Sequence, residues 1–191
     1  MYNKFLPKFK VVEINNMAAL RMGHVIAQNA IDKENIRLED KSGYKYLENG
    51  VMVGLGLDGK IANYDPAKHA QPMLVFTEEL IAGPFYSLDQ YAEEVGADDV
   101  YPRCLPLYLG DTFTTNNIDG YSEAPEFAFA NGDYGIRADG LIVKAEEEKY
   151  AMFRGVACKL PAGQAAVELQ VINVKAEVAP EPAAAEEEVG E

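Results

Sequence analysis

Alternation of apolar and polar residues predicts β-strands along most of the chain. Apolar residues occupy every second position from Val51 to Leu57, and again from Val167 to Val171, where Glu168 and Gln170 alternate with them. A period of two with one apolar face is typical of a half-buried strand. Further strands are expected at residues 9–14, 24–28, 60–64, 73–77, 105–109, 126–130, 134–138, 141–144 and 151–158.

Turn dipeptides separate several of these segments. A glycine that follows Asn or Asp supplies the positive φ that short hairpin turns need. Five such pairs occur: Asn49-Gly50, Asp58-Gly59, Asp119-Gly120, Asn131-Gly132 and Asp139-Gly140. Many short strands with closely spaced turns predict a mainly β protein, a small sandwich or barrel built from hairpins. Long helices between strands, which a parallel α/β fold would need, are not indicated.

One short helix is expected in the middle of the chain. Ser87 and Gln90 have the spacing of a capping box, residues 88–95 follow, and Gly96 occupies the place of a helix-terminating glycine. This helix would belong to an insert at about residues 78–96. A weaker helix candidate spans residues 16–22.

The composition changes abruptly at Val174. From there to Glu191 the sequence has no aromatic residue and six glutamates against one lysine. Such a segment buries too little surface to fold by itself. We therefore divide the chain into an N-terminal arm and first strand at 1–15, a β-rich globular body at 16–173, and a disordered acidic C-terminal tail at 174–191.

Charge and hydropathy exclude some classes of partner. The chain of 191 residues has a formal net charge of −14, and its 17 Lys and Arg residues are scattered. Nucleic-acid phosphates would repel such a protein unless it had a local basic stripe. The longest apolar run is far shorter than the ~20 residues of a membrane span, and no signal peptide is evident. We expect no nucleic-acid partner, no membrane partner and a cytoplasmic site of synthesis.

Four patterns resemble sites of known chemistry, and each has a simpler interpretation. Residues 54–59 match G-x-G-x-x-G, but a hairpin turn and a strand follow instead of a helix. Residues 115–126 have part of a calcium-loop spacing with Thr115 in the first place, and are expected to form a turn. Cys104 and Cys158 are expected to be reduced thiols, and neither histidine has a partner at ligand spacing. Paired acids are interpreted as solvated surface. We therefore predict no catalytic, cofactor-binding or metal site.

Aromatic residues are concentrated in the middle of the chain. Tyrosine suits interfaces because it combines an apolar ring with a polar tip. Core packing explains the same residues equally well. As an interface, the contacts would include Phe85, Tyr86, Tyr101 and Tyr108.

Three stretches resemble the small virion structural proteins of tailed bacteriophages, among them head decoration (cement) proteins. These are GVMVGLGLDGKIANYDPAKH at 50–69, LGDTFTTNNID with NGDYGIRADGLIV within 109–143, and LPAGQAAVELQVI at 160–172. The resemblance covers about half of the chain and includes neither the insert nor the tail. It implies a non-enzymatic, β-rich protein that binds the lattice of the major capsid protein and other virion proteins, often as a trimer. It also implies a place on the capsid surface, after assembly in the host cytoplasm.

The basic N-terminal arm offers a further contact. Its Lys4, Lys8 and Lys10 would pair with an acidic capsid surface. Two alternatives stay open: a head-fibre, head–tail or tail component, and a β-sandwich module that binds carbohydrate or another ligand. A concave patch of tyrosine with asparagine and aspartate would favour the second alternative.

Overall fold

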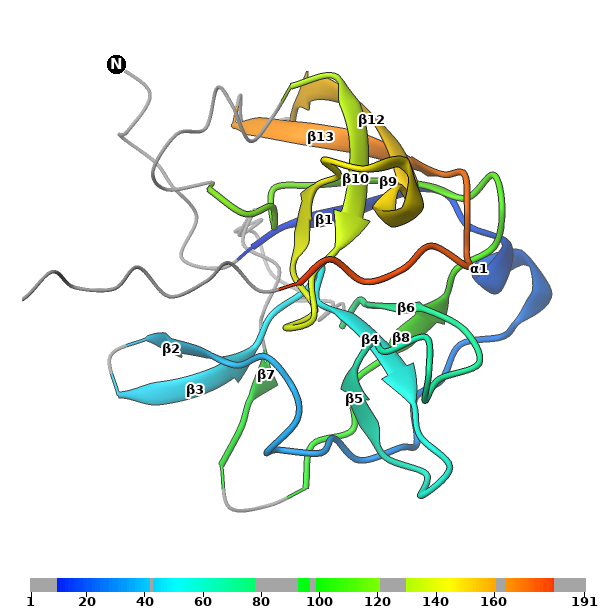
Figure 1. The fold of residues 1–191 in the computed structure, drawn as a ribbon. Helices are drawn as coiled ribbons and strands as arrows, with labels where there is room; N and C mark the ends of the chain where they lie inside the picture. Colours follow the sequence, from blue (N-terminus) through cyan, green and yellow to red (C-terminus); the bar gives the residue numbers. More distant parts are fainter. Residues whose placement is uncertain are drawn as a thin grey trace, which may run out of the picture.

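The computed structural model describes residues 10–41, 43–77, 93–96, 99–120, 130–160 and 164–180 (Figure 1). The protein is mainly β, with three antiparallel sheets that stay open and do not close into barrels. Within the described residues, the helical elements are α1 (Ala18–Met22) and the 3-10 turn η1 (Glu148–Tyr150). The predicted mainly β fold class is therefore confirmed.

The largest sheet has six strands in the order β1-β9-β13-β12-β10-β11. Its longest pairing joins β12 to β13, from Phe153 opposite Val171 to Lys159 opposite Ala165. The alternation that predicted β13 is confirmed, because Val167, Leu169 and Val171 are buried while Glu168 and Gln170 are exposed. The strands are β1 (Val12–Asn16), β9 (Thr112–Thr115), β10 (Gly132–Ile136), β11 (Ile142–Lys144), β12 (Phe153–Lys159) and β13 (Ala165–Val171).

A four-stranded sheet, in the order β5-β4-β6-β8, packs against the first. Both of its edges are covered by the segment 26–31. Ile26 exchanges backbone hydrogen bonds with Cys104 at one edge, and Asp32 donates to Ile61 at the other. The strands are β4 (Met52–Leu55), β5 (Ile61–Asn63), β6 (Met73–Val75) and β8 (Cys104–Pro106). A smaller sheet joins β2 (Glu39–Lys41), β3 (Tyr44–Leu47) and β7 (Glu93–Glu94).

The main core lies between the two larger sheets. Phe113 and Phe153 of the six-stranded sheet pack edge to face, with ring centroids 5.7 Å apart, and Met52 and Leu74 join the same cluster from the four-stranded sheet. A second cluster, which includes Val53, covers the other face of the four-stranded sheet. That sheet is therefore buried on both faces, and the predicted half-buried strand at 51–57 is wrong in that respect.

Four of the five expected dipeptides lie in turns, whereas Gly132 of the fifth, Asn131-Gly132, is the first residue of β10, with φ of 145°. Asp58-Gly59 closes the β4–β5 hairpin and Asp139-Gly140 the β10–β11 hairpin, with φ of 77° at Gly59 and 83° at Gly140. Gly140 is also closely packed, because a Cβ there would lie 2.8 Å from the Met52 carbonyl oxygen. The turn therefore also brings the two larger sheets into close contact.

The helix expected at 88–95 is wrong at its C-terminal end, and residues 78–92 lie outside the described residues. Glu94 pairs with Tyr46 of β3, and the Val95 amide donates to the Lys45 carbonyl. A two-turn helix has little stability of its own, so pairing with an existing strand outweighs the local capping signal. The weaker candidate at 16–22 is confirmed as α1, which ends at Gly23.

The first seven residues that we assigned to the disordered tail pack against the body. Ala176 is 1% exposed, and Val174 and Val178 lie against the main core. The Ala179 amide donates to Ile136, and its carbonyl accepts from Ala138. The composition predicted disorder because this segment cannot form a core by itself. It is ordered because its small apolar residues at alternate positions pack on the core of the body. Residues 181–191 lie outside the described residues.

Candidate functional site

The contacts predicted from sequence are only partly within the structure. Lys4, Lys8, Phe85 and Tyr86 lie outside the described residues. The Lys10 amide donates to Glu48 Oε2 at 3.3 Å. Tyr101, half exposed, precedes β8, and Tyr108 follows it, so these two tyrosines stand at opposite ends of one short strand. Whether the full set of predicted contacts forms one surface stays a prediction, because only Lys10, Tyr101 and Tyr108 are among the described residues.

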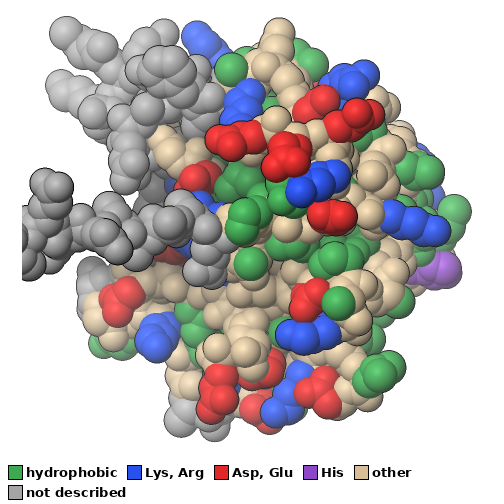
Figure 2. Space-filling model, in the orientation of Figure 1, with side chains coloured by type: hydrophobic (Ala, Val, Ile, Leu, Met, Phe, Trp, Pro, Cys, Tyr) green, Lys and Arg blue, Asp and Glu red, His purple; other side chains and the backbone are tan. Residues whose placement is uncertain are grey.

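Tyr108 borders a surface that we call the α1 surface, formed by Leu20 and Met22 of α1 and by Leu109 of the loop between β8 and β9. Their exposed fractions are 46%, 60% and 66%. Figure 2 shows charged side chains of both signs intermixed on one face, with apolar side chains at its right-hand edge, where α1 lies in Figure 1. Large apolar side chains that are exposed on one contiguous surface are typical of an interaction site, which makes these three residues a candidate.

The carboxylate of Asp111 fixes this surface in shape. It is buried and accepts hydrogen bonds from the Ala18 amide at 2.7 Å and the Tyr108 amide at 2.9 Å. His24 Nδ1 lies 3.0 Å from the Tyr108 hydroxyl. Beside the helix, Leu20 lines a shallow hollow of about 340 Å³ together with Ile14 and Phe76. The α1 surface is thus held at both ends by hydrogen bonds.

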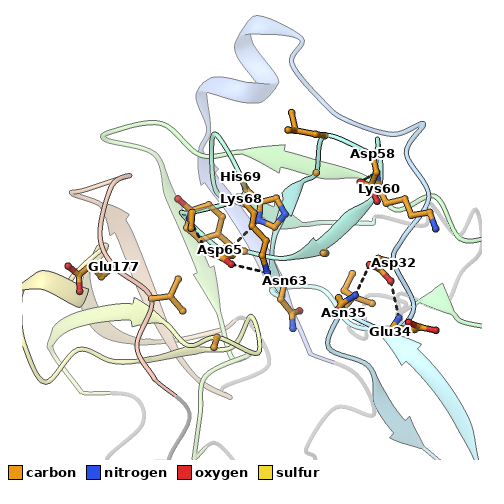
Figure 3. A pocket seen from close by; sticks show the side chains of 18 of the residues that line it. Asp32, Glu34, Asn35, Asp58, Lys60, Asn63, Asp65, Lys68, His69 and Glu177 are labelled. Carbon is orange, nitrogen blue, oxygen red and sulfur yellow. Dashed lines mark hydrogen bonds and ion pairs between the residues drawn. The ribbon is translucent and has the colours of Figure 1, made fainter.

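A second candidate is a groove of about 1110 Å³, which we call the polar groove. Its walls are the segment 32–36, the β4–β5 hairpin, the turn 64–69, and residues 177–180 with Ala138 and Tyr150. In Figure 3, Asp32 and Asn35 stand on one side and Glu177 on the other, with His69 and Asp65 between them. Five segments that are distant in sequence therefore form one site.

His69 is the most buried polar group that lines the polar groove, at 7% exposure. Its Nδ1 accepts the Asp65 backbone amide at 2.9 Å. Because a backbone N–H can only donate, the ring proton must be on Nε2. Burial lowers the pKa of His69 below 6.5, although the nearby Asp65 opposes this. The ring is therefore neutral at pH 7.

The glycines of G-x-G-x-x-G make room for this histidine and for the turn. A Cβ at Gly54 would lie 2.3 Å from His69 Cγ, and one at Gly56 would lie 2.6 Å from Asp58 Oδ1. The Gly56 amide donates to the Lys60 carbonyl, which closes the hairpin into β5. The prediction of a crowded strand that leads into a hairpin is confirmed.

The other motifs take structural places. Thr115 is fully buried, and its hydroxyl donates to the Val11 carbonyl, while the Asn117 amide group donates to Asn49. Cys104 is buried, and burial together with the Glu168 charge raises the pKa of Cys158. Across the described parts of the chain, no group of His, Cys, Asp and Glu is arranged to hold a metal ion.

A network of charged side chains links separate hairpins, and no local sequence pattern predicted it. Arg137 donates to Asp139 at 2.9 Å and to Asp119 at 3.1 Å. Arg37 contacts the same Asp139 and also Glu39. Arg137 and Asp139 are only 13% and 21% exposed in their side chains. The network joins the β10–β11 turn to the smaller sheet.

No protein-family model, curated protein or solved structure matches this chain. Among the residues that the structure describes, none belongs to a helix with the length and hydropathy to cross a membrane. A functional interpretation therefore starts from the two surfaces described above and from the resemblance noted in the sequence.

Proposed function

We propose that the protein is a virion structural component of a tailed bacteriophage that decorates and stabilises the capsid by binding the major capsid protein lattice. It acts without catalysis, as one of many copies and as a homo-oligomer. The three stretches that resemble decoration proteins support this proposal. The observation that carries it is the exposure of Leu20, Met22 and Leu109 on α1 and on the loop after β8, two segments that Asp111 links by hydrogen bonds.

The energy of one such contact is modest. Burying an exposed Leu or Met side chain completely is worth about 1.5–3 kcal/mol, so these three partly exposed residues supply roughly 3–4 kcal/mol. Alone, that is a weak association. Repetition over a lattice, and linkage of copies within an oligomer, multiplies it through effective concentration. A decoration protein therefore needs only a small apolar contact in each copy.

Co-sedimentation with capsid shells assembled without the protein tests this proposal. We expect saturable binding in a fixed ratio to the capsid subunit. That ratio distinguishes a trimer at each lattice axis from a head-fibre, head–tail or tail component, which would be present in fewer copies per capsid. Replacing both Met22 and Leu109 with aspartate should weaken binding by about tenfold or more, because each change places a charge in the contact.

Leu57→Asp is the matched control, because Leu57 is 106% exposed on a hairpin away from the α1 surface. It should bind shells like the wild type. Failure of the wild-type protein to bind intact shells would refute capsid decoration and favour a tail component. Equal binding of the double variant and the wild type would show that another surface makes the contact. Deletion of residues 1–10, which removes Lys4, Lys8 and Lys10, tests the lysine arm separately, and unchanged binding to shells would refute that contact.

A further inference from the structure

The polar groove has a chemistry of its own that capsid binding does not use. At about 1110 Å³ it exceeds the volume of a single small molecule, and hydrogen-bonding groups line it along its length. Charged residues of both signs are present: Lys60 and Lys68 against Asp32, Glu34, Asp58, Asp65 and Glu177. An anionic ligand would therefore meet an excess of carboxylates.

The most informative group is the Nε2–H of His69. The ring is more than nine-tenths buried and lines the polar groove, and within the described residues Nε2 has no hydrogen-bond partner. Its other nitrogen is fixed by the Asp65 amide, and Gly54 lets the ring lie against β4. A fixed donor that is open to the groove can donate to an oxygen of a bound ligand.

Donors and acceptors alternate around this histidine. Asn63 lines the groove and uses its side-chain oxygen to accept the Arg37 amide, which leaves its NH₂ group as a donor. Asn35 donates to Asp32 through its NH₂ group, so its oxygen remains an acceptor. Because each sugar hydroxyl both donates and accepts, a saccharide can use neighbouring groups of both kinds.

Apolar groups complete the lining. Leu57 is fully exposed at the tip of the β4–β5 hairpin, and Tyr150, Val178 and Pro180 form the opposite wall. The C–H faces of sugar rings pack on such side chains. A basic peptide would match the acids but would be repelled by Lys60 and Lys68, whereas a neutral ligand is repelled by neither set of charges.

We propose that the polar groove binds a neutral saccharide chain, with His69 Nε2 and Asn63 as donors and Asn35 and Asp58 as acceptors. His69 lies in the turn 64–69, Asp58 in the β4–β5 hairpin, Asn63 at the end of β5 and Asn35 in the segment 32–36, so the groups come from different walls of the groove. This function is independent of capsid binding, because Leu20, Met22 and Leu109 of the α1 surface do not line the groove. The protein would then hold a glycan while attached to its shell.

The test uses the full chain on an array of defined neutral oligosaccharides of hexose and N-acetylhexosamine, followed by calorimetric titration with the strongest binder. We expect saturable binding that changes little as salt rises to about 0.5 M, since a neutral ligand is not screened. His69→Phe should weaken binding about tenfold, the loss of one good hydrogen bond. Asp58→Asn, which keeps the oxygen that accepts the Lys60 amide, should weaken it severalfold.

His24→Gln is the control, because His24 lies beside Tyr108 and outside the groove, and it should bind like the wild type. Circular dichroism of each variant excludes a loss of fold. The proposal is overturned if no oligosaccharide on the array binds, or if binding is the same in the His69 and Asp58 variants. Salt-sensitive binding of tetralysine without oligosaccharide binding would identify a peptide groove instead.

Discussion

The charged network around Asp139 should contribute measurably to stability. The Asp139 carboxylate accepts from Arg137 at 2.9 and 3.0 Å and also contacts Arg37. Asp139→Asn replaces this carboxylate with a neutral amide. Arg137 stays 13% exposed and keeps only Asp119. Breaking a fully buried ion pair costs about 3–5 kcal/mol, and breaking an exposed pair costs about 0–1 kcal/mol. Because Asp139 and Arg137 are largely but not fully buried, we expect Asp139→Asn to lower the free energy of unfolding by about 2 kcal/mol.

Urea unfolding followed by circular dichroism measures this loss, which corresponds to roughly 4–8 °C in melting temperature for a domain of this size. Asp133→Asn is the matched control. Its bond to Arg154 is 3.2 Å long, and the side chains are 40% and 65% exposed, so it should cost less than about 0.5 kcal/mol. Equal, small losses in the two variants would refute the reasoning.

The pH dependence provides a second check. Burial alone would raise the pKa of Asp139, but the hydrogen bonds from Arg137 and Leu141 and the charge of Arg37 bring it below 3.8. A carboxyl with a lowered pKa in the folded state stabilises the protein above its unfolded pKa. The difference between wild type and Asp139→Asn should therefore be constant from neutral pH to about pH 5 and shrink below about pH 4. A difference that grows on acidification would contradict the assignment.

Three further predictions concern packing. Gly54→Ala should lower the free energy of unfolding in urea by about 1–3 kcal/mol, because the new methyl group overlaps His69. Gly96→Ala, which has open space around it, should be nearly neutral. Equal effects of the two changes would contradict the close packing of Gly54 against His69. The pKa of His69 is lowered below 6.5, so its neutral ring stabilises the fold above that pH. The free energy of unfolding of the wild type in urea should therefore exceed that of His69→Gln by less as pH falls below about 6.5. A difference that grows on acidification would contradict this. Truncation after Pro180 should leave the melting temperature unchanged, but truncation after Asn173 should lower it by several degrees; equal values would refute a stabilising role for residues 174–180.

Local pattern predicted the elements whose stabilising contacts are close in sequence. The β12–β13 hairpin and the turn at Asp58-Gly59 were evident because alternation and turn residues are encoded within a few positions. Strand β9 was missed: its threonines are polar, yet Thr115 is fully buried between β1 and β13. Burial at that position is decided by strands that pair over long distances, which a local window does not contain.

The polar groove was hidden from the sequence for a similar reason. Its lining comes from five separate segments, and no spacing rule relates Asn35 to Glu177. One local signal was available: Asp65 and His69 are four residues apart in a turn, and the ring nitrogen accepts the Asp65 amide. The predicted contacts Tyr101 and Tyr108 were chosen by residue type alone, which does not show which surface they join.

The pairing of β1 with β9 determines when the protein can fold during synthesis. Val12 pairs with Thr115, and Thr115 pairs in turn with Val167, so the largest sheet joins both ends of the body. A nascent chain must hold its first strand without a partner until β9 leaves the ribosome, and β9 lacks its second neighbour until β13 follows. Contacts of such long range slow folding and expose strand edges in the meantime. The native sheet should therefore form only after β13 has left the ribosome, and fragments that end before β13 should not acquire it.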